Sequence, residues 1–407
     1  MAHSILCPYC FKSFPANTAK YQCENQEKFN GNEKCPSLID AILNDYWQED
    51  GVPSKRIFDA RVFKLFSHKV RGAECPTCHM RTTRLVCPEC HNPIPTQMIE
   101  EGSEIISIIG DRNSGKTVYF LSLIQQLKRY GYKIGLYEVN PMDLAHSEAT
   151  KPATVYTKMA AQLFDNHHLP EQNRATRPAP LIFRLSFQGK TKKENKSIYL
   201  IFYDTAGEIF QDSIRANEMA TYLKDSVGVI FLIDPFTLEG VRDILVSGGI
   251  VKNVAENYVG ADPSRIFDCL LKINGNERLK DKPLALTYSK IDVVVNALEA
   301  SPQGYSIQGV NLKANSSFIK TGKFNLGEIE DINEGLKTIS EEKWDTGRFW
   351  GSASGAYAEG NVRMFAISAL GSNPDAAGRI DKVVPYRVMD PLVWILHKIG
   401  FAIPTVE

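Results

Sequence analysis

The fold is decided by the stretch "SEIISIIGDRNSGKTVYFLSLIQQL", residues 103–127. Its first part, up to Gly110, is a short apolar run rich in isoleucine, which is typical of a strand buried on both faces. From Val118 onward apolar residues recur at helical spacing. The stretch therefore predicts a strand, a glycine-containing loop and a helix, in that order.

The loop has a complete phosphate-binding pattern. Gly110, four further residues, Gly115, Lys116 and Thr117 match G-x-x-x-x-G-K-[ST]. The glycines let successive backbone N–H groups turn toward phosphates, and the helix N-terminus adds partial positive charge. We expect Lys116 to reach the β- and γ-phosphates and Thr117 to bind magnesium. The expected loop residues are Asp111, Arg112, Asn113, Ser114, Gly115, Lys116, Thr117 and Val118. A chance glycine-rich turn is the alternative, and the flanking strand and helix disfavour it.

Three later apolar runs also end in polar motifs. "KSIYLIFYD", residues 196–204, ends in Asp204 and leads to Gly207. An Asp at a strand end can hold magnesium through water, and the N–H of Gly207 can sense a γ-phosphate. "KPLALTYSKID", residues 282–292, ends in Lys290 and Asp292, and "VRMFAIS", residues 362–368, leads into Ser368, Ala369 and Leu370. Parallel strands place such motifs at one sheet edge.

In this order the four motifs resemble those of the GTPases of the Ras-like, translation-factor-related (TRAFAC) class. The resemblance implies an α/β fold, a Ras-like P-loop domain with a mostly parallel sheet. It also implies that Asp292 accepts hydrogen bonds from N1 and N2 of guanine and that the Lys290 stem lies along the base. The backbone of residues 368–370 would touch the guanine oxygen. Ser289 stands where this class has Asn or Thr, and an ATP-binding P-loop protein is the alternative.

The resemblance also implies a switch threonine that closes over magnesium in the GTP state. Thr150, Thr154, Thr157 and Thr176 lie in the expected interval, and we choose Thr176 because it lies in a Pro-rich loop just before an apolar strand.

Glu208 stands where efficient relatives have Gln, so hydrolysis is expected to be slow. A carboxylate accepts a hydrogen bond from the attacking water but donates none to the transition state. Gln211, Arg112 or a partner could supply the missing group. The expected catalytic residues are Lys116, Thr176, Gly207 and Glu208.

Eight of the nine cysteines fall within the first 90 residues. "CPTCHMRTTRLVCPEC", residues 75–90, offers two Cys-x2-Cys knuckles, which we expect to surround one zinc ion as Cys75, Cys78, Cys87 and Cys90. The second zinc site would use Cys7, Cys10, Cys23 and Cys35. An alternative pairs the knuckle of Cys7 with a later one and leaves Cys23 and Cys35 free. His79 and His91 are expected to be bystanders, and a reducing cytoplasm disfavours disulfides.

The segment between the two cysteine sets has its own pattern. Leu38, Ile39, Ile42 and Leu43 have helical spacing, and residues 57–66 form a strand-like run. We expect this segment to pack between the zinc sites.

Composition and charge limit the function classes. The chain has 407 residues, with 47 basic and 47 acidic side chains, so no whole-molecule field draws it to nucleic acid or to an anionic membrane. The first 100 residues also lack a basic stripe. With neither a secretory signal nor an apolar run of about 20 residues, we expect a cytoplasmic protein without membrane contact. The expected domains are residues 1–98, a zinc-ribbon region, and 99–407, the GTPase domain with insertions.

The whole arrangement resembles bacterial double-GTPase-type proteins, which are predicted parts of prokaryotic conflict systems. That resemblance implies protein partners such as other GTPases or products of neighbouring genes. Our first hypothesis is a GTP-binding switch with slow magnesium-dependent hydrolysis, whose zinc ribbons and insertions dock partners. Its cofactors would be GTP/GDP, Mg²⁺ and two Zn²⁺. The alternatives are a zinc-ribbon nucleic-acid-binding protein gated by GTP, and a pseudo-GTPase without turnover.

Overall fold

Backbone contacts divide the chain into two compact units, each described by itself below. The first unit comprises residues 1–104, 141–155 and 175–182, and the second comprises the remainder. The computed structural model describes residues 3–25, 35–51, 53–110, 114–142, 152–171, 179–189, 195–202, 223–247, 279–300, 312, 315–342, 347–375 and 377–406. The domain boundary between residues 98 and 99 stays a prediction.

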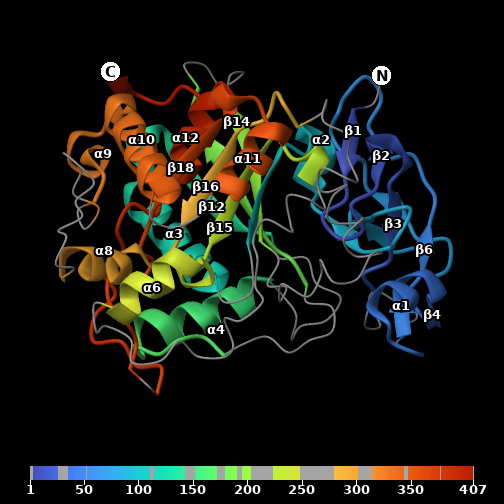
Figure 1. Cartoon of the computed structure of the whole chain (residues 1–407). Coiled ribbons are helices and arrows are strands. Elements are labelled where there is room, and N and C mark those ends of the chain that lie inside the picture. The colour runs from blue at the N-terminus through green and yellow to red at the C-terminus, as the bar shows by residue number, and fades with distance from the viewer. Residues whose placement is uncertain are drawn as a thin grey trace. The chain divides into compact units, whose positions relative to one another are not determined.

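The second unit is built on a seven-stranded sheet (Figure 1). Its strands, in order across the sheet, are β12 (Leu136–Pro141), β13 (Leu181–Phe187), β14 (Lys196–Phe202), β11 (Ile105–Gly110), β15 (Gly228–Ile233), β16 (Leu284–Tyr288) and β18 (Val362–Ala366). The pairs from β14 to β18 are all parallel. The expected α/β fold with a mostly parallel sheet is confirmed.

The middle strands are apolar because both faces of the sheet are covered. Every residue of β11 and of β15 is buried. Aromatic side chains fill the space beside β11: the ring of Phe120 stacks on that of Phe202 at 4.7 Å and meets the edge of Phe183 at 5.4 Å. Offset and edge-to-face pairs of this kind add about 0.5–1.5 kcal/mol beyond their buried area.

Helices complete the second unit. They are α3 (Lys116–Tyr130), α4 (Pro152–Phe164), α6 (Glu239–Ser247), α8 (Ile291–Ala300), α9 (Ser317–Thr321), α10 (Leu326–Glu342), α11 (Gly347–Ala356) and α12 (Asp390–Lys398). Among them α3 packs on β11, α10 on β18, and α12 on β15 and β16. A short parallel pair, β17 (Phe324–Asn325) with β19 (Thr405–Val406), joins the polar insertion expected at residues 301–327 to the last strand of the described chain.

Where the structure describes them, residues 3–104 of the first unit form small sheets, two short α-helices and a 3-10 turn at Ala16–Thr18. Its elements are β1 (Ser4–Leu6), β2 (Ser13–Pro15), β3 (Lys20–Gln22), β4 (Ser37–Ile39), α1 (Ala41–Trp47), β5 (Pro53–Lys55), β6 (Ile57–Phe58), β7 (Ala73–Glu74), β8 (Arg81–Thr82), β9 (Leu85–Val86), β10 (Pro93–Ile94) and α2 (Thr96–Glu101). The sheets are β1-β2, β4-β5, β7-β8 and β10-β9-β3-β6.

Two local predictions for this unit are right only in part, since α1 contains Ile42 and Leu43 and β6 begins at Ile57. The helix begins only at Ala41, because Asp40 accepts hydrogen bonds from the N–H groups of Ile42 and Leu43 and so caps it. Of the four apolar residues with helical spacing only Leu43 is buried. The strand-like run at 57–66 ends at Phe58.

Candidate nucleotide site and cysteine clusters

The predicted phosphate loop follows the end of β11. A Cβ atom on Gly110 would lie 2.5 Å from the carbonyl oxygen of Leu232 and 2.8 Å from Oγ of Ser114, so only glycine fits there. Gly115 has φ of +75°, which glycine adopts without strain, and it caps the start of α3. The structure therefore requires glycine at both glycine positions of the motif.

Lys116 is the first residue of α3, and its side chain reaches back to the end of β11. Its ammonium donates to the carbonyl oxygen of Gly110 at 3.0 Å, and the side chain is buried. Thr117 and Val118 follow in the first turn of the same helix. The geometry places a buried cation and a helix N-terminus on one loop, which is the chemistry that binds phosphate.

The other described motifs lie at the same edge of the sheet. Because β11, β15, β16 and β18 are parallel neighbours, their carboxyl ends meet there. β16 lies two strands from β11, which corresponds to about 10 Å at the usual strand spacing. A ligand bound to the phosphate loop could therefore span from β11 to the ends of β16 and β18.

Lys290 follows β16 and pairs with a residue that follows β15. Its ammonium lies 2.7 Å from Oδ2 of Asp234, a carboxylate with 0% of its side chain exposed. Lys290 has φ of +52°, a left-handed conformation that is uncommon for a non-glycine residue. Its ammonium also lies 5.4 Å from the centre of the Phe236 ring. The lysine is thus held in one orientation at the strand ends.

Ser289 and Asp292 are both buried beside this pair. The hydroxyl of Ser289 donates to the carbonyl oxygen of Ile233 at 3.1 Å, so this side chain ties β16 to β15. Asp292 lies in the first turn of α8, where the helix N-terminus stabilises a carboxylate.

The loop after β18 is fixed by hydrogen bonds on two sides. The backbones of Ser368 and Tyr386 exchange hydrogen bonds of 3.1 and 2.8 Å. The hydroxyl of Ser122, in α3, donates to the carbonyl oxygen of Ala369 at 2.8 Å. The carbonyl oxygen of Leu370 accepts from Val384 at 2.7 Å. The helix that begins with Lys116 therefore also positions the Ser-Ala loop.

The remaining candidates lie outside the described residues. They are Asp111, Arg112, Asn113, Thr150, Thr176, Asp204, Gly207, Glu208 and Gln211. β14, which precedes Asp204 in the chain, is described, and its Phe202 pairs in register with Ile108 of β11.

Asp234 was not among the predicted site residues. The signal that could have found it is its place in "SVGVIFLIDPF", since it directly follows a buried strand as the other candidate motifs do.

The cysteines form two clusters, and the predicted grouping is wrong. One cluster holds Cys7, Cys10, Cys87 and Cys90, and the other holds Cys23, Cys35, Cys75 and Cys78, with the sulfurs of each set within 4.8 Å of one another. The knuckle of Cys7 does pair with a later knuckle, but Cys23 and Cys35 are not left free.

The interleaving follows from strand pairing. The eight residues between the later knuckles form β8 and β9, which belong to different sheets: β8 pairs with β7, and β9 pairs with β3 and β10. The two knuckles therefore cannot fold back on each other as one hairpin. The strand β3 ends beside Cys23 and brings it to the knuckle of Cys75 and Cys78.

Sulfur distances within each cluster suit a tetrahedral ion. The sulfur atoms of Cys7 and Cys90 lie 3.7 Å apart, and those of Cys23 and Cys78 lie 3.5 Å apart. Zinc–sulfur bonds of about 2.3 Å place tetrahedral sulfurs about 3.8 Å apart. Burial raises the pKa of Cys7 and Cys23. A divalent cation beside these thiols would be what turns them into thiolates.

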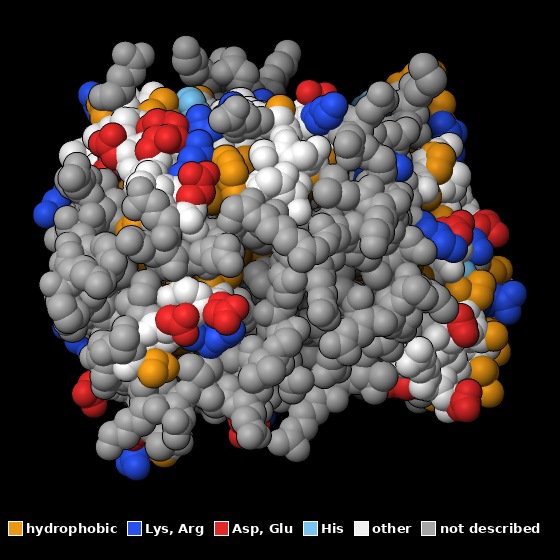
Figure 2. All heavy atoms as spheres, viewed as in Figure 1, with side chains coloured by type: hydrophobic (Ala, Val, Ile, Leu, Met, Phe, Trp, Pro, Cys, Tyr) orange, Lys and Arg blue, Asp and Glu red, His pale blue; other side chains and the backbone are white. Residues whose placement is uncertain are grey.

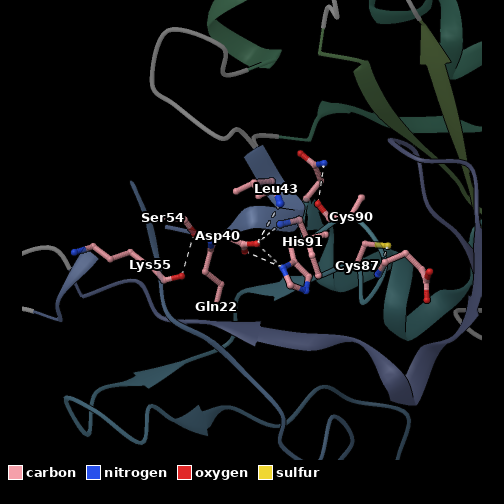
Figure 3. A network of polar contacts seen from close by, with 11 residues as sticks. Gln22, Asp40, Leu43, Ser54, Lys55, Cys87, Cys90 and His91 are labelled. Carbon is pink, nitrogen blue, oxygen red and sulfur yellow. Dashed lines mark hydrogen bonds and ion pairs between the residues drawn. The ribbon is translucent and has the colours of Figure 1, made fainter. Parts of the chain in front are cut away.

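A polar network ties the first cluster to α1 (Figure 3). Nδ1 of His91 lies 2.8 Å from Oδ2 of Asp40, the residue that caps α1, and both side chains are mostly buried. His91 directly follows Cys90, and its φ of +57° belongs to the turn of the knuckle. His91 is thus not a cluster member but holds α1 against the knuckle.

Among the described residues no helix is both long and apolar enough to cross a membrane.

Comparison with known proteins finds a relative by sequence and similar folds among solved structures. A Mycolicibacterium smegmatis protein, named as the ESX-1 scaffolding and assembly protein SaeC, is 24% identical over 329 residues, which cover 77% of this chain and 80% of that protein.

Among solved structures, the GTP-bound GTPase-like domain of Ski7 from S. cerevisiae is 11% identical with a TM-score of 0.29, and the match covers 75% of this chain. The chain spans about half (51%) of that Ski7 chain. A nucleolar GTP-binding protein 1 from Plasmodium falciparum is 10% identical with a TM-score of 0.28, covering 73% of this chain and 86% of that one.

Residues 104–322, more than half of the chain, match the model of the Double-GTPase 2 family, from the strand before the phosphate loop to the insertion beyond Lys290 and Asp292. With its GTPase-like domain and its two four-cysteine clusters, the chain belongs to the double-GTPase family.

Proposed function

We propose that this chain is a magnesium-dependent GTP-binding switch with slow hydrolysis, whose zinc ribbons and insertions dock protein partners. The observation that carries the proposal is the meeting of Lys116, the Lys290 segment and the Ser368 loop at one carboxyl edge of the sheet. Ligands of open α/β sheets bind at this edge.

The residues present fit a nucleotide with magnesium. Gly110 leaves no room for a side chain at the end of β11, and the Lys116 ammonium lies 3.0 Å from its carbonyl oxygen. Backbone N–H groups of the loop between them would bind the phosphates. Thr117 and Asp204 would hold magnesium, with Thr176 joining them in the GTP state. Magnesium would neutralise charge that develops on the β- and γ-phosphate oxygens.

Guanine would be read by Asp292, with the Lys290 stem along the base. A carboxylate accepts hydrogen bonds from N1 and N2 of guanine, and adenine offers no such pair of donors there. Gly207 would contact the γ-phosphate, and Glu208 would leave hydrolysis slow, because it cannot donate to the transition state.

Nucleotide choice provides the first test. Purified chain should bind GTP and GDP and not ATP in competition with a fluorescent GDP analogue. Asp292→Asn should lose GTP and gain xanthosine triphosphate, because the amide N–H₂ can donate to the oxygen that xanthine has in place of the guanine amino group. Asp331→Asn, an exposed Asp of α10, is the control. Equal binding of ATP and GTP by the unmodified chain would refute the guanine assignment.

Turnover separates the enzyme from the pseudo-GTPase. Phosphate release from GTP with magnesium should be slow and should stop in Lys116→Ala. If no phosphate is released, or if Lys116→Ala releases it at the same rate, the chain is a nucleotide-binding pseudo-GTPase.

We further propose that each cysteine cluster binds one zinc ion. Four thiols at tetrahedral spacing, all buried except the partly exposed Cys10, are a closed set typical of structural zinc. Elemental analysis should give two zinc ions per chain.

The proposal of protein partners is supported by the Mycolicibacterium smegmatis relative, whose name describes ESX-1 scaffolding and assembly. We propose that this chain also organises other proteins, including products of neighbouring genes and other GTPases. The tagged chain should hold such a partner in its GTP-analogue form and release it with GDP. Equal capture in both nucleotide states would contradict a switch.

A further inference from the structure

The turn between β4 and α1 exposes three large aliphatic side chains. Leu38 is 43% exposed, Ile39 is 70% exposed, and Ile42 is 45% exposed. We call these three residues the apolar turn. Their spacing in the sequence is that of core residues, yet the structure leaves them at the surface. A cluster of aliphatic residues on the surface indicates an interaction site more often than isolated ones do.

The apolar turn is held in place by buried contacts. Asp40, in the middle of it, caps α1 and pairs with His91 beside the first cysteine cluster (Figure 3). On the inner side of the helix, the hydroxyl of Tyr46 donates to the carbonyl oxygen of Tyr9 at 3.0 Å. The backbone of the turn is therefore preformed, which lowers the ordering cost of binding.

Acidic side chains border the apolar turn. Asp45 lies three residues after Ile42 on the same face of α1, and Glu49 and Asp50 follow the helix; all three are exposed. Figure 2 shows hydrophobic and acidic side chains side by side over α1 and β4. A partner surface should thus be apolar at its centre and basic at its border.

The second unit has a cavity whose lining combines aromatic faces with polar and basic groups. It has a volume of about 380 Å³ and lies between the C-terminal end of α3 and the start of β12. Its lining includes Leu127, Leu136, Tyr132 and Tyr137, and these two tyrosines are 70% and 56% exposed. Exposed tyrosines offer a large apolar face at low entropic cost and are enriched in interfaces.

Basic residues border this tyrosine cavity. Lys128 lines it, Arg129 is its exposed neighbour in α3, and the ammonium of Lys133 lies 5.6 Å from the centre of the Tyr132 ring. The one acidic side chain of the lining, Glu138, is paired with Arg184 at 3.1 Å. The cavity is therefore the charge complement of the apolar turn.

We propose that the apolar turn of one copy of this chain docks in the tyrosine cavity of a second copy. Because the two surfaces differ, the contact is heterologous, and each bound copy leaves one surface of either kind for a further copy. Both surfaces are small, so the assembly is weak and grows with concentration. This head-to-tail assembly does not depend on the nucleotide switch and goes beyond it.

Sedimentation velocity of the full chain tests the proposal. Over about a hundredfold range in concentration the average mass should rise beyond that of a dimer. Ile39→Asp spoils only the turn and Tyr132→Asp only the cavity, so each variant alone should stay monomeric. An equal mixture should form one dimer and nothing larger, through the intact cavity of the first variant and the intact turn of the second.

Val246→Asp, which changes another exposed aliphatic residue, should assemble as the unmodified chain does. Ile42→Asp repeats the test if Ile39→Asp does not fold. Three results would overturn the proposal: an unmodified chain that stays monomeric, variants that assemble alone, or a mixture of the two variants that stays monomeric. GTP binding by all variants should be unchanged, so a failure here is distinct from a failure of the switch.

Discussion

The buried carboxylate of Asp234 pairs with the partly exposed ammonium of Lys290, and we predict that Asp234 acts as a positioning residue through that lysine. Its carboxylate fixes an ammonium whose backbone is in a left-handed conformation. Asp234→Ala and Lys290→Ala should each weaken GTP binding. The double variant should be little weaker than either, which corresponds to a coupling free energy of about 1–3 kcal/mol. Equilibrium titration of all four proteins measures this quantity.

The carboxylate has a second partner, which the control must separate. Oδ1 of Asp234 accepts from the N–H of Phe236 at 3.0 Å, and Asp234→Asn keeps that acceptor while removing the charge. Asp234→Asn should therefore bind GTP as weakly as Asp234→Ala. Two results would mean that Asp234 acts only on its own turn. One is that the Asp234→Ala and Lys290→Ala losses of GTP affinity add in the double variant, and the other is that Asp234→Asn binds GTP as tightly as the unmodified chain. Asp243→Ala in α6 should show no coupling to Lys290.

Asp390 makes the stability of the second unit depend on pH. Burial raises the pKa of Asp390 to about 6. Arg387 donates to this carboxylate at 3.1 Å and lowers its pKa, but the same guanidinium also binds Glu328, whose negative charge raises the pKa of Asp390. The folded state therefore holds the proton more tightly than the unfolded state, and the contribution of Asp390 to stability falls as pH rises from about 4 to about 6. A shift of this size corresponds to about 3 kcal/mol.

Asp390→Asn should remove that loss while leaving Arg387 paired with Glu328. The unfolding temperature of this variant minus that of the unmodified chain should increase as pH rises from about 4 to about 6. Taking the difference cancels the effect of acid on the cysteine clusters. A difference that does not change with pH, as expected for the exposed Asp381→Asn, would show that Asp390 does not titrate there.

At the scale of elements, the interleaved clusters make a prediction about zinc content. Cys10→Ser with Cys87→Ser removes two ligands of one cluster, so the chain should keep one zinc ion. Cys10→Ser with Cys23→Ser damages both clusters and should leave none. Grouping in sequence order would give the reverse pair of results. Elemental analysis of the two double variants decides between them.

The sequence could predict elements whose local pattern agrees with their packing. The strand, loop and helix around Lys116 appear as expected, because buried strand, glycine spacing and helix periodicity all favour the same structure. Cysteine spacing could locate the knuckles but not their grouping, since that depends on which strand β9 joins. Likewise the polar, turn-rich sequence of the insertion at 301–327 does not predict α9. This helix depends on Phe318, which is fully buried and contacts Phe324.

At the scale of the whole molecule, the two compact units, which we propose bind different ligands, should unfold separately. Removing zinc should lower the free energy of unfolding of the first unit alone, because both cysteine clusters lie in that unit. GDP with magnesium stabilises only the unit that binds it, by about 2.7 kcal/mol at a hundred times Kd. Calorimetry should thus show two transitions, one lowered by a chelator and the other raised by GDP, and Lys116→Ala should abolish only the second shift. Hydrogen exchange assigns them: after chelation β3 and β9 should exchange faster while β11 and β15 keep their protection. One transition that moves under both treatments would show that the units unfold as a single cooperative body.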